Sequence, residues 1–336
     1  MLSPCTFQDQ LPPSETLFRV SHAEGTLELA AALMLLLSPW AASAPVTHCS
    51  LPRSRPWRVA FIGDSITKGN TTFGRPPAMV SDGPPQWHTA VGCWPCELRA
   101  RALRDNVDMQ LHNLGVWGVP VLSSAHSSKA DHTSPPYSEL LDGRFSQAVP
   151  AALADADVLL VMLGTNDGKS DAAEVRSHFE NDLRALFERL LAMRHTARNR
   201  SCAWLLPPPL IHGGSGSGPV FGIQPAVVRA LSPRVRAVAA AVGVGVIDVR
   251  APLEQDWRAS FGRAEGGSAV GDGVHPPPYG MRVIAETVWQ KLAQQHGRAR
   301  RALQAAAAPT VSGRRRLQRR RTNMIGAADG RRTRRA

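Results

Sequence analysis

Short apolar runs and longer amphipathic stretches alternate along residues 57–296 of this 336-residue chain. The apolar runs, rich in aliphatic and β-branched residues, predict strands at 58–62, 107–111, 158–163, 202–206 and 244–249. The amphipathic stretches predict helices near 94–104, 145–154, 172–195, 224–241 and 279–295. Nearly continuous apolar strands that alternate with helices are typical of a parallel sheet covered on both faces. The pattern therefore predicts an α/β fold with a doubly wound parallel sheet, a three-layer α/β/α sandwich, in one domain over residues 56–296.

Two polar segments interrupt this pattern. Residues 120–143 are rich in Ser, His and Pro, and residues 207–218 contain three prolines followed by a Gly–Ser stretch. Long connections in such a sheet are usually functional or lack fixed structure. We expect the loop residues His126, His132 and Tyr137 either to line a pocket or to be solvated.

The net charge of the chain belongs to its C-terminal end. There are 39 Lys and Arg residues against 27 Asp and Glu, a formal charge of +12, and residues 298–336 alone contain 13 Arg and a single Asp. The rest of the chain is electrically balanced, so the charge describes a tail and not the domain. Repeated Arg blocks repel one another, and residues 297–336 are predicted to be a disordered tail. Such a tail either binds a polyanion (nucleic acid, an acidic polysaccharide or an anionic surface) or has no dedicated partner, and it lacks the aromatic residues that stack on bases.

The N-terminal extension, residues 1–55, contains an apolar run at 29–37 that is followed by the small residues Ala-Ser-Ala at 42–44. This arrangement is typical of a secretory signal peptide with its cleavage site, and the run is too short to span a bilayer core of about 30 Å. We therefore expect a signal segment at about 29–44, no transmembrane segment, and a protein that is secreted or lies in the secretory pathway. A translation start at Met34 and a poorly ordered extension are the alternatives.

The chain has five cysteines, too few for a fold built on disulfides. Cleavage after Ala44 would leave four of them, an even number that suits two bridges in an oxidising compartment. Cys93 and Cys96 form a CxxC motif, but a zinc site would need a second pair, and no predicted strand leads into the motif as in a thioredoxin-like fold. The motif therefore favours a local disulfide or two buried thiols over a metal site.

Four polar segments lie at the ends of predicted strands or just before the last predicted helix. The first, Gly63-Asp64-Ser65, follows the first strand, where a glycine permits a tight turn and Ser65 would be exposed at a strand-to-helix corner. A serine in that position is a candidate nucleophile, or simply the N-cap of a helix. The segment is not the GxSxG elbow of the α/β-hydrolases.

The second and third segments offer hydrogen-bond donors. Asn113-Leu-Gly115-Val-Trp-Gly118 comes after the second predicted strand, and its glycines would let a backbone N–H approach a developing oxyanion. Gly164-Thr165-Asn166-Asp167 follows the third strand, and Asn166 would supply a neutral amide donor. Ordinary turns are the alternative for both segments, since Asn, Asp and Gly favour turns.

The fourth segment, Asp272-Gly-Val-His275-Pro276, opens the last predicted helix. The short spacing lets the Asp272 carboxylate fix one tautomer of the His275 imidazole, which can then take a proton from a serine hydroxyl. The alternative makes Asp272 a cap, Pro276 an early helical residue and His275 incidental. Together the four segments supply a nucleophile, a base, an orienting acid and two oxyanion donors at one edge of one sheet, which is the full set for acyl transfer.

In this order the four segments resemble the four blocks of the GDSL/SGNH hydrolases, a family of serine esterases, and the resemblance covers the whole predicted domain. It implies a flavodoxin-like sandwich in which Ser65 is the nucleophile, His275 the base and Asp272 its partner. It also implies an oxyanion hole made by the backbone N–H groups of Ser65 and Gly118 and by the side chain of Asn166. This chemistry needs no metal and no organic cofactor.

The expected reaction is hydrolysis of a short-chain acyl ester, an O-acetyl ester above all, through an acyl-Ser65 intermediate. Residues 164–169 and 204–209 are similar to those of family members that act as carbohydrate O-acetylesterases, so an acylated carbohydrate is a candidate substrate beside small esters. Trp117 would stack on a sugar ring or simply pack in the core. The alternatives are a lipase or thioesterase of the same family and, in a different class, a noncatalytic protein that binds polyanions through the Arg-rich tail.

Overall fold

The computed structural model describes residues 49, 51, 52, 54–69, 93–128, 134–194, 202–211, 221–255 and 273–307, with side chains up to residue 297. The chain divides into two units, Met1–Pro45 and Val46–Ala336, and all the described residues belong to the second. The predicted signal segment and Asp272 lie outside the described residues. Of the helices that are described, none combines the length and the apolar character needed to cross a membrane.

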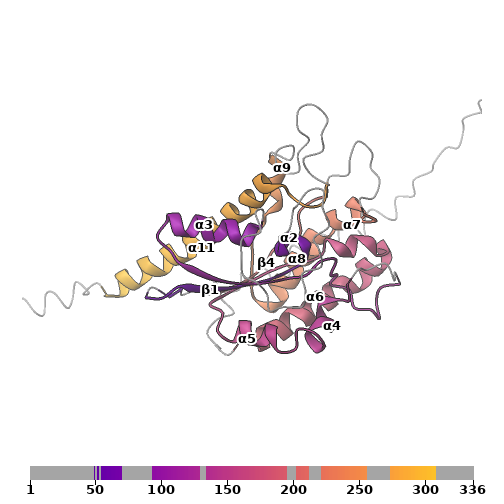
Figure 1. Ribbon diagram of the computed structural model, residues 1–336, viewed down its shortest axis with the longest axis horizontal. Coiled ribbons are helices and arrows are strands. Elements are labelled where there is room, and N and C mark those ends of the chain that lie inside the picture. The colour runs from indigo at the N-terminus through magenta and orange to yellow at the C-terminus, as the bar shows by residue number, and fades with distance from the viewer. Residues whose placement is uncertain are drawn as a thin grey trace, which may run out of the picture. The chain divides into compact units, whose positions relative to one another are not determined.

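Parallel strands form a five-stranded sheet at the centre of the second unit (Figure 1). They are β1 (Trp57–Gly63), β2 (Met109–Gly115), β3 (Val158–Met162), β4 (Ala203–Leu205) and β5 (Gly245–Val246). Their order is β2-β1-β3-β4-β5, and each neighbouring pair is parallel. β2 thus lies on one side of β1 and the later strands lie on the other, which is the doubly wound order of flavodoxin-like folds. The predicted α/β class and parallel sheet are confirmed.

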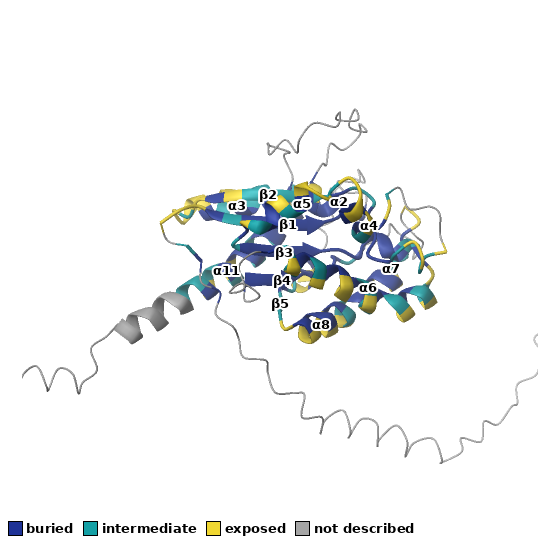
Figure 2. Ribbon diagram, turned by 90° about the horizontal axis from the view of Figure 1, so that it is seen from below, coloured by how far each residue is buried: buried dark blue, intermediate teal, exposed yellow. Residues whose placement is uncertain are grey.

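Both faces of the sheet are buried, because successive side chains of a strand point to opposite faces. In β1, Val59 and Phe61 belong to one apolar cluster, and Ala60 and Ile62 belong to another. The first cluster includes residues of α3 (Trp94–Arg104), α9 (Arg250–Gln255) and α11 (Pro278–Ala307). The second includes residues of α4 (Tyr137–Asp142), α5 (Ala148–Ala154), α6 (Ala172–Ala192), α7 (Pro225–Arg229) and α8 (Leu231–Val242). Figure 2 shows the buried strands between these helices.

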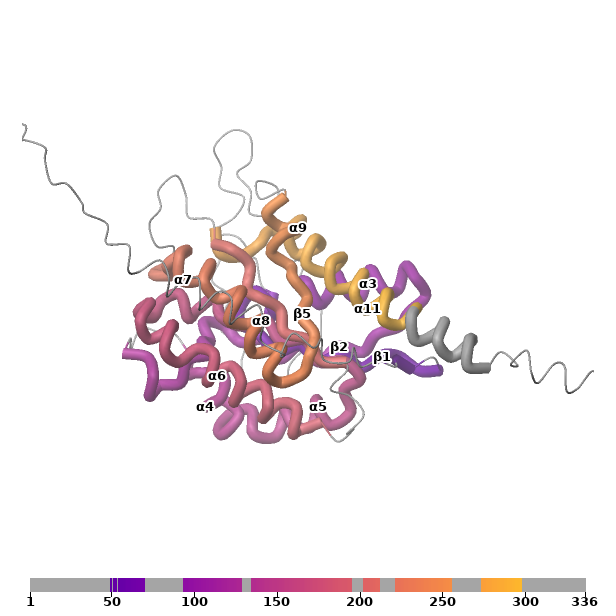
Figure 3. Tube along the Cα trace, turned by 180° about the vertical axis from the view of Figure 1, so that it is seen from behind, coloured from indigo at the N-terminus to yellow at the C-terminus, as the bar shows by residue number. Residues whose placement is uncertain are grey.

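Two helices that are far apart in the sequence complete one layer: α3 and α11 lie side by side on the same face of the sheet (Figures 1 and 3). Two short helical turns follow strands, α2 (Ser65–Lys68) after β1 and the 3-10 turn η2 (Asn166–Lys169) after β3. In a doubly wound sheet, sites form beyond the carboxyl ends of the strands. α2 and η2 therefore lie where a site is expected.

The elements differ from the predicted ones mainly at their ends. α3 has the predicted bounds, but the predicted helix 224–241 is divided into α7 and α8 at Ala230. α4 lies within the segment that was predicted as a loop, because Tyr137, Leu140 and Leu141 form a buried apolar face there. The predicted second strand is displaced toward the C-terminus, since β2 pairs with β1 along its whole length, up to Gly63 opposite Gly115.

The last helix is longer than predicted. α11 continues to Ala307, past the predicted boundary between domain and tail at residue 297. Residues 298–307 consist of Ala, Arg, Leu and Gln, which have high helix propensities and readily extend a helix that has already formed. Residues 308–336, with most of the Arg blocks, lie outside the described residues, and polyanion binding by them stays a prediction.

Two disulfides, Cys93–Cys96 and Cys49–Cys202, are formed within the described residues. The first confirms the local bridge at the CxxC motif. It lies at the start of α3, where Cys93 is the N-cap and its Sγ accepts the N–H of Cys96. The second joins the segment before β1 to the residue before β4, across a sequence separation of 153. A crosslink over so long a loop restricts the unfolded chain and stabilises the fold by about 4 kcal/mol.

Candidate active site

The candidate nucleophile lies at the turn between β1 and α2. Asp64 is the N-cap of α2, and its Oδ1 accepts the N–H of Ile66 at 2.9 Å. The N-cap interpretation of Ser65 is therefore wrong: Ser65 is the first residue of the helix, at the carboxyl end of β1. Gly63 is required at this turn, because a Cβ there would lie 2.0 Å from Thr67 Oγ1.

Ser65 and His275 lie 210 positions apart in the sequence but close together in the fold. Ser65 Oγ lies 2.7 Å from His275 Nε2, which is a hydrogen-bond distance. His275 precedes α11 in a turn where Gly273 has a φ of +80°, a conformation that favours glycine, and where Val274 is buried. Because Asp272 lies outside the described residues, the Ser–His pair is the part of the predicted triad that the structure brings together.

Trp117 borders this pair. Its ring centroid lies 5.8 Å from that of His275, with an interplanar angle of 53°. The side chain is only partly buried. Trp117 therefore presents an aromatic surface next to the candidate base, which core packing alone would not require.

The second predicted segment divides into two parts. Asn113 and Gly115 lie inside β2 and not after it, which corrects their predicted position. The Asn113 amide donates to the carbonyl oxygens of Thr67 and Lys68 at 3.0 and 3.2 Å, so it satisfies backbone groups at the end of α2 that have no partner within the helix. A Cβ on Gly115 would lie 2.4 Å from the Lys68 nitrogen. These two residues therefore seat α2 against β2.

Gly118 and Asn166, the predicted oxyanion donors, lie in neighbouring segments. Gly118 has a φ of +67°, in the left-handed region that glycine adopts most easily. Asn166 begins η2 and is buried. Its side-chain amide donates to the carbonyl oxygen of Val119 at 3.3 Å. This bond joins the start of η2 to the residue directly after Gly118.

The contacts that Asp167 makes were not predicted. This carboxylate is fully buried and accepts the N–H of Val121, at 2.9 Å from its nearer oxygen, and that of Leu122 at 2.8 Å. Burial raises the pKa of Asp167 to about 6; the two backbone N–H groups oppose this shift, and the nearby Asp64 carboxylate adds to it. The only signal in the sequence was an acidic residue directly after Asn166.

Asp64 is the second buried carboxylate at this edge of the sheet. Burial raises its pKa above the usual range, against the effect of its hydrogen bond from the Ile66 N–H and of the nearby His275. Two carboxyl groups are thus buried at this edge of the sheet, Asp64 directly before Ser65 and Asp167 directly after Asn166. Groups of three or more His, Cys, Asp or Glu side chains that could hold a metal do not occur among the described residues.

The loop residues that were expected to line a pocket or to be solvated have other roles. Tyr137 is fully buried, and its hydroxyl donates to the carbonyl oxygen of Leu114 at 2.8 Å. His126 stacks on His178 with ring centroids 4.1 Å apart, and its Nδ1 lies 2.9 Å from an oxygen of Asp182. His132 lies outside the described residues. Tyr137 and His126 therefore anchor the loop to the fold.

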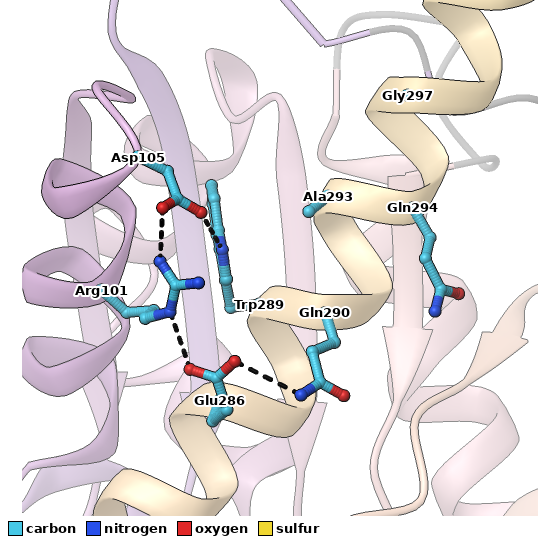
Figure 4. Close-up of a pocket in the computed structure, with 8 residues that line it drawn as sticks. All are labelled: Arg101, Asp105, Glu286, Trp289, Gln290, Ala293, Gln294 and Gly297. Carbon is cyan, nitrogen blue, oxygen red and sulfur yellow. Dashed lines mark hydrogen bonds and ion pairs between the residues drawn. The ribbon is translucent and has the colours of Figure 1, made fainter.

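A shallow groove of about 440 Å³ lies elsewhere, between α3 and α11 (Figure 4). Arg101, Asp105 and Glu286 line it and are paired with one another, and Trp289 donates its indole N–H to Asp105. The Trp289 ring centroid lies 5.8 Å from that of Trp57, the first residue of β1. The groove therefore lies at the amino ends of the strands, away from Ser65.

The fold and the site together define an α/β protein with a Ser–His pair at the carboxyl edge of a parallel sheet. The sequence profile of the GDSL-like Lipase/Acylhydrolase family matches residues 61–283, which is more than half of the chain. The chain therefore belongs to this family, and it is a carboxylic ester hydrolase.

Solved structures of similar fold include a lipase/acylhydrolase from Enterococcus faecalis, which is 15% identical with a TM-score of 0.46; the match covers 72% of this chain and 96% of that one. An acetylxylan esterase from Geobacillus stearothermophilus is 17% identical with a TM-score of 0.47, and that match covers 73% of this chain and 96% of the other. No curated protein sequence matches this chain. At these identities the likeness concerns the fold and not the substrate.

Proposed function

We propose that this protein is a serine esterase that hydrolyses short-chain acyl esters, O-acetyl esters above all, through an acyl-Ser65 intermediate. One observation carries the proposal: Ser65 Oγ lies 2.7 Å from His275 Nε2 at the carboxyl edge of the sheet. A neutral imidazole at this distance can accept the hydroxyl proton while the oxygen attacks an ester carbonyl.

In the first half of the reaction, Ser65 Oγ attacks the carbonyl carbon and His275 Nε2 takes the hydroxyl proton. The charge that develops on the carbonyl oxygen is met by the backbone N–H groups of Ser65 and Gly118 and by the Asn166 amide. A single such donor is worth about 3 kcal/mol in a serine hydrolase. The alcohol then leaves with the proton from His275, and the acyl group stays on Ser65.

In the second half, water attacks the acyl-Ser65 carbonyl while His275 again accepts a proton, and the carboxylic acid is released as Ser65 regains its hydrogen. Asp272, the proposed partner of His275, would hold the imidazole in the tautomer whose Nε2 is free to accept. The Asn166 amide has two N–H groups, and the bond to the Val119 carbonyl oxygen uses one of them. The other is left for the oxyanion.

The surroundings of the Ser65–His275 pair favour a substrate with a small acyl group on an alcohol that has a flat face, such as a sugar ring. Ser65 is only 6% exposed, so a compact acyl group reaches it most easily. Trp117 offers a partly exposed ring beside His275, on which a sugar ring could stack. Trp204 is only 3% exposed and packs in the core, so it supports the fold and not the substrate. An acylated carbohydrate as substrate therefore depends on Trp117.

We also propose that the protein passes through the secretory pathway. The two disulfides support this, because such bonds persist in oxidising compartments and are rare in the cytosol. N-terminal sequencing of protein recovered from the medium of expressing cells checks the predicted cleavage after Ala44. A secreted protein that begins upstream of residue 29 would contradict the proposed signal segment.

The experiment for the proposed activity uses the purified chain with p-nitrophenyl acetate, butyrate and octanoate, and with acetylated xylan. We expect the highest kcat/KM on the acetyl esters and a loss of about 10⁴-fold or more in kcat for Ser65→Ala. Ser138→Ala, which removes a serine hydroxyl from α4, is the control and keeps full activity. Turnover that survives in Ser65→Ala would overturn the mechanism. Preference for octanoate would instead identify a lipase.

A further inference from the structure

The loop that follows Gly118 is tied to a single later segment of the chain. The Val119 carbonyl oxygen accepts a hydrogen bond from the Asn166 amide. The backbone N–H groups of Val121 and Leu122 both donate to Asp167. The amide of Ser123 donates to Asp182 of α6 at 2.9 Å. Three consecutive backbone N–H groups are thus held by carboxylates, and the loop has little freedom to shift relative to η2.

Asp167 is the central member of this arrangement. Its Oδ1 lies 3.1 Å from the Val121 nitrogen and 2.8 Å from the Leu122 nitrogen, and its Oδ2 lies 2.9 Å from the Val121 nitrogen. Both oxygens therefore accept, which a carboxylate can do and a primary amide cannot, since an amide presents one acceptor and one donor. Asp167 also directly follows Asn166 in η2. One turn therefore supplies one proposed oxyanion donor, Asn166, and the carboxylate that holds the loop of the other proposed donor, Gly118.

We propose that Asp167 is a positioning residue for the esterase reaction: by holding Val121 and Leu122 it keeps the Gly118 N–H and the Asn166 amide aimed at one point, where the oxyanion forms. The inference rests on the proposed function, because it presupposes an oxyanion bound beside Ser65. Asp167 does not touch the reacting atoms and acts through the loop.

The energetics of the carboxylate support a role in positioning rather than in stability. Burial raises the pKa of Asp167 to about 6, so the ionised form is disfavoured in the folded protein. A group whose pKa is raised on folding contributes stability that is present at low pH and is lost as the pH rises through the folded value. The Asp167 carboxylate is therefore charged at neutral pH, and its charge lowers the free energy of unfolding, as is common at functional sites.

Few other titratable groups lie around Asp167 that could change its protonation. Asp64 faces it from the β1–α2 turn and raises its pKa, and His275 acts on Asp64. On the side of α7, Ile223 and Val228 pack against Gly168 and are apolar. In the loop, His126 is paired with Asp182, the acceptor of the Ser123 amide.

The test compares Asp167→Asn with Asp182→Asn, which also removes a carboxylate that accepts a backbone N–H of the same loop, one residue further from Gly118. We expect Asp167→Asn to lower kcat by about 10- to 100-fold, with KM within about two-fold, because a small misplacement of catalytic groups has an effect of this size. Asp182→Asn should keep kcat within about three-fold of wild type, since its anchor lies further along the loop. Wild-type kcat in Asp167→Asn, or equal losses in both variants with a matching fall in Tm, would overturn the inference.

The pH profile gives a second readout that a merely structural role would not move. In the wild type, protonation of Asp167, whose pKa burial raises to about 6, releases the loop amides, so kcat/KM should fall more steeply below about pH 6 than in Asp167→Asn. Asp167→Asn should also have a Tm at pH 7 no lower than wild type. Acid limbs of equal steepness in the wild type and in Asp167→Asn would overturn the inference. If the wild type itself showed no turnover that depends on Ser65, the proposed function would be contradicted instead.

Discussion

Charged side chains gather at both edges of the sheet, and the two groups are held in opposite ways. At the amino edge, Arg101 contacts Asp105 at 2.7 Å and Glu286 at 2.8 Å, on a partly exposed surface (Figure 4). At the carboxyl edge, Asp64 and Asp167 are fully buried, and backbone N–H groups bind them. Among the described residues, neither forms an ion pair with Lys or Arg.

This difference distinguishes the cluster at the amino edge, which supports the fold, from the cluster at the carboxyl edge, which we propose serves catalysis. Exposed ion pairs gain little, because water screens them, but they also need little desolvation. Buried carboxylates without a cation carry a large desolvation penalty, and a fold retains them where their charge or their geometry serves chemistry. Among the residues that the structure describes, such groups occur at the carboxyl edge, where Ser65, His275 and Asn166 gather.

After the loss expected for Ser65→Ala, the largest effect that we expect at the carboxyl edge comes from removing the Asn166 amide. Asn166→Ala deletes the proposed donor to the oxyanion, and we expect kcat to fall by about 10² to 10³-fold with p-nitrophenyl acetate, as for oxyanion donors in other serine hydrolases. Asn181→Ala removes an exposed amide from α6 and should leave kcat unchanged. A loss of less than ten-fold in Asn166→Ala would mean that its amide serves only the bond to Val119.

A smaller effect, on stability, is expected from Asp64. Its folded pKa is raised by burial, so the neutral form stabilises the fold at low pH, and this contribution is lost as the pH rises through the folded pKa. Asn is as good an N-cap as Asp and carries no charge. Asp64→Asn should therefore raise the free energy of unfolding at pH 7 by about 1 kcal/mol, and the gain should disappear under acidic conditions.

Chemical denaturation at several pH values measures this difference. Asp171→Asn is the matched control, because Asp171 is also the N-cap of a helix, α6, but is exposed. Its substitution should leave the free energy of unfolding at pH 7 nearly unchanged, because Asn caps a helix about as well as Asp. If Asp64→Asn were less stable than wild type at pH 7, the ionised Asp64 would contribute to the fold, and the contrast between the two edges would weaken.

The position of the candidate site could be predicted from the sequence because parallel strands end at one edge of a sheet. Ser65 and Asn166 each follow a strand that was found from its apolar run alone, β1 and β3. The apolar pattern of residues 107–111 could not locate the end of β2, since pairing with β1 decides it and places Asn113 and Gly115 inside the strand. Local sequence indicates where a strand occurs, whereas its register depends on its neighbour.

The contacts that hold the site in place were not predictable for the same reason. Asp167 binds the amides of Val121 and Leu122, which lie 46 and 45 positions away in the sequence. Nothing in the local pattern distinguishes this residue from an ordinary turn aspartate. Likewise, the helix propensity of residues 298–307 was hidden by their positive charge, which suggested a disordered tail.

The smallest effect is expected at the amino edge, from Arg101→Ala. The hydrogen bonds of Asp105 with Arg101 and with Trp289 hold the pKa of that carboxyl below its usual range, so this contribution to stability is present at neutral pH and is lost as the pH falls. Because these side chains are partly exposed, we expect Tm at pH 7 to fall by only about 2 °C and kcat to stay at the wild-type value. Arg99→Ala, an exposed neighbour on α3, controls for the loss of one positive charge. A large loss of turnover in Arg101→Ala, measured with the same acetyl esters, would show that the two edges are coupled and that the amino edge is more than a structural cluster.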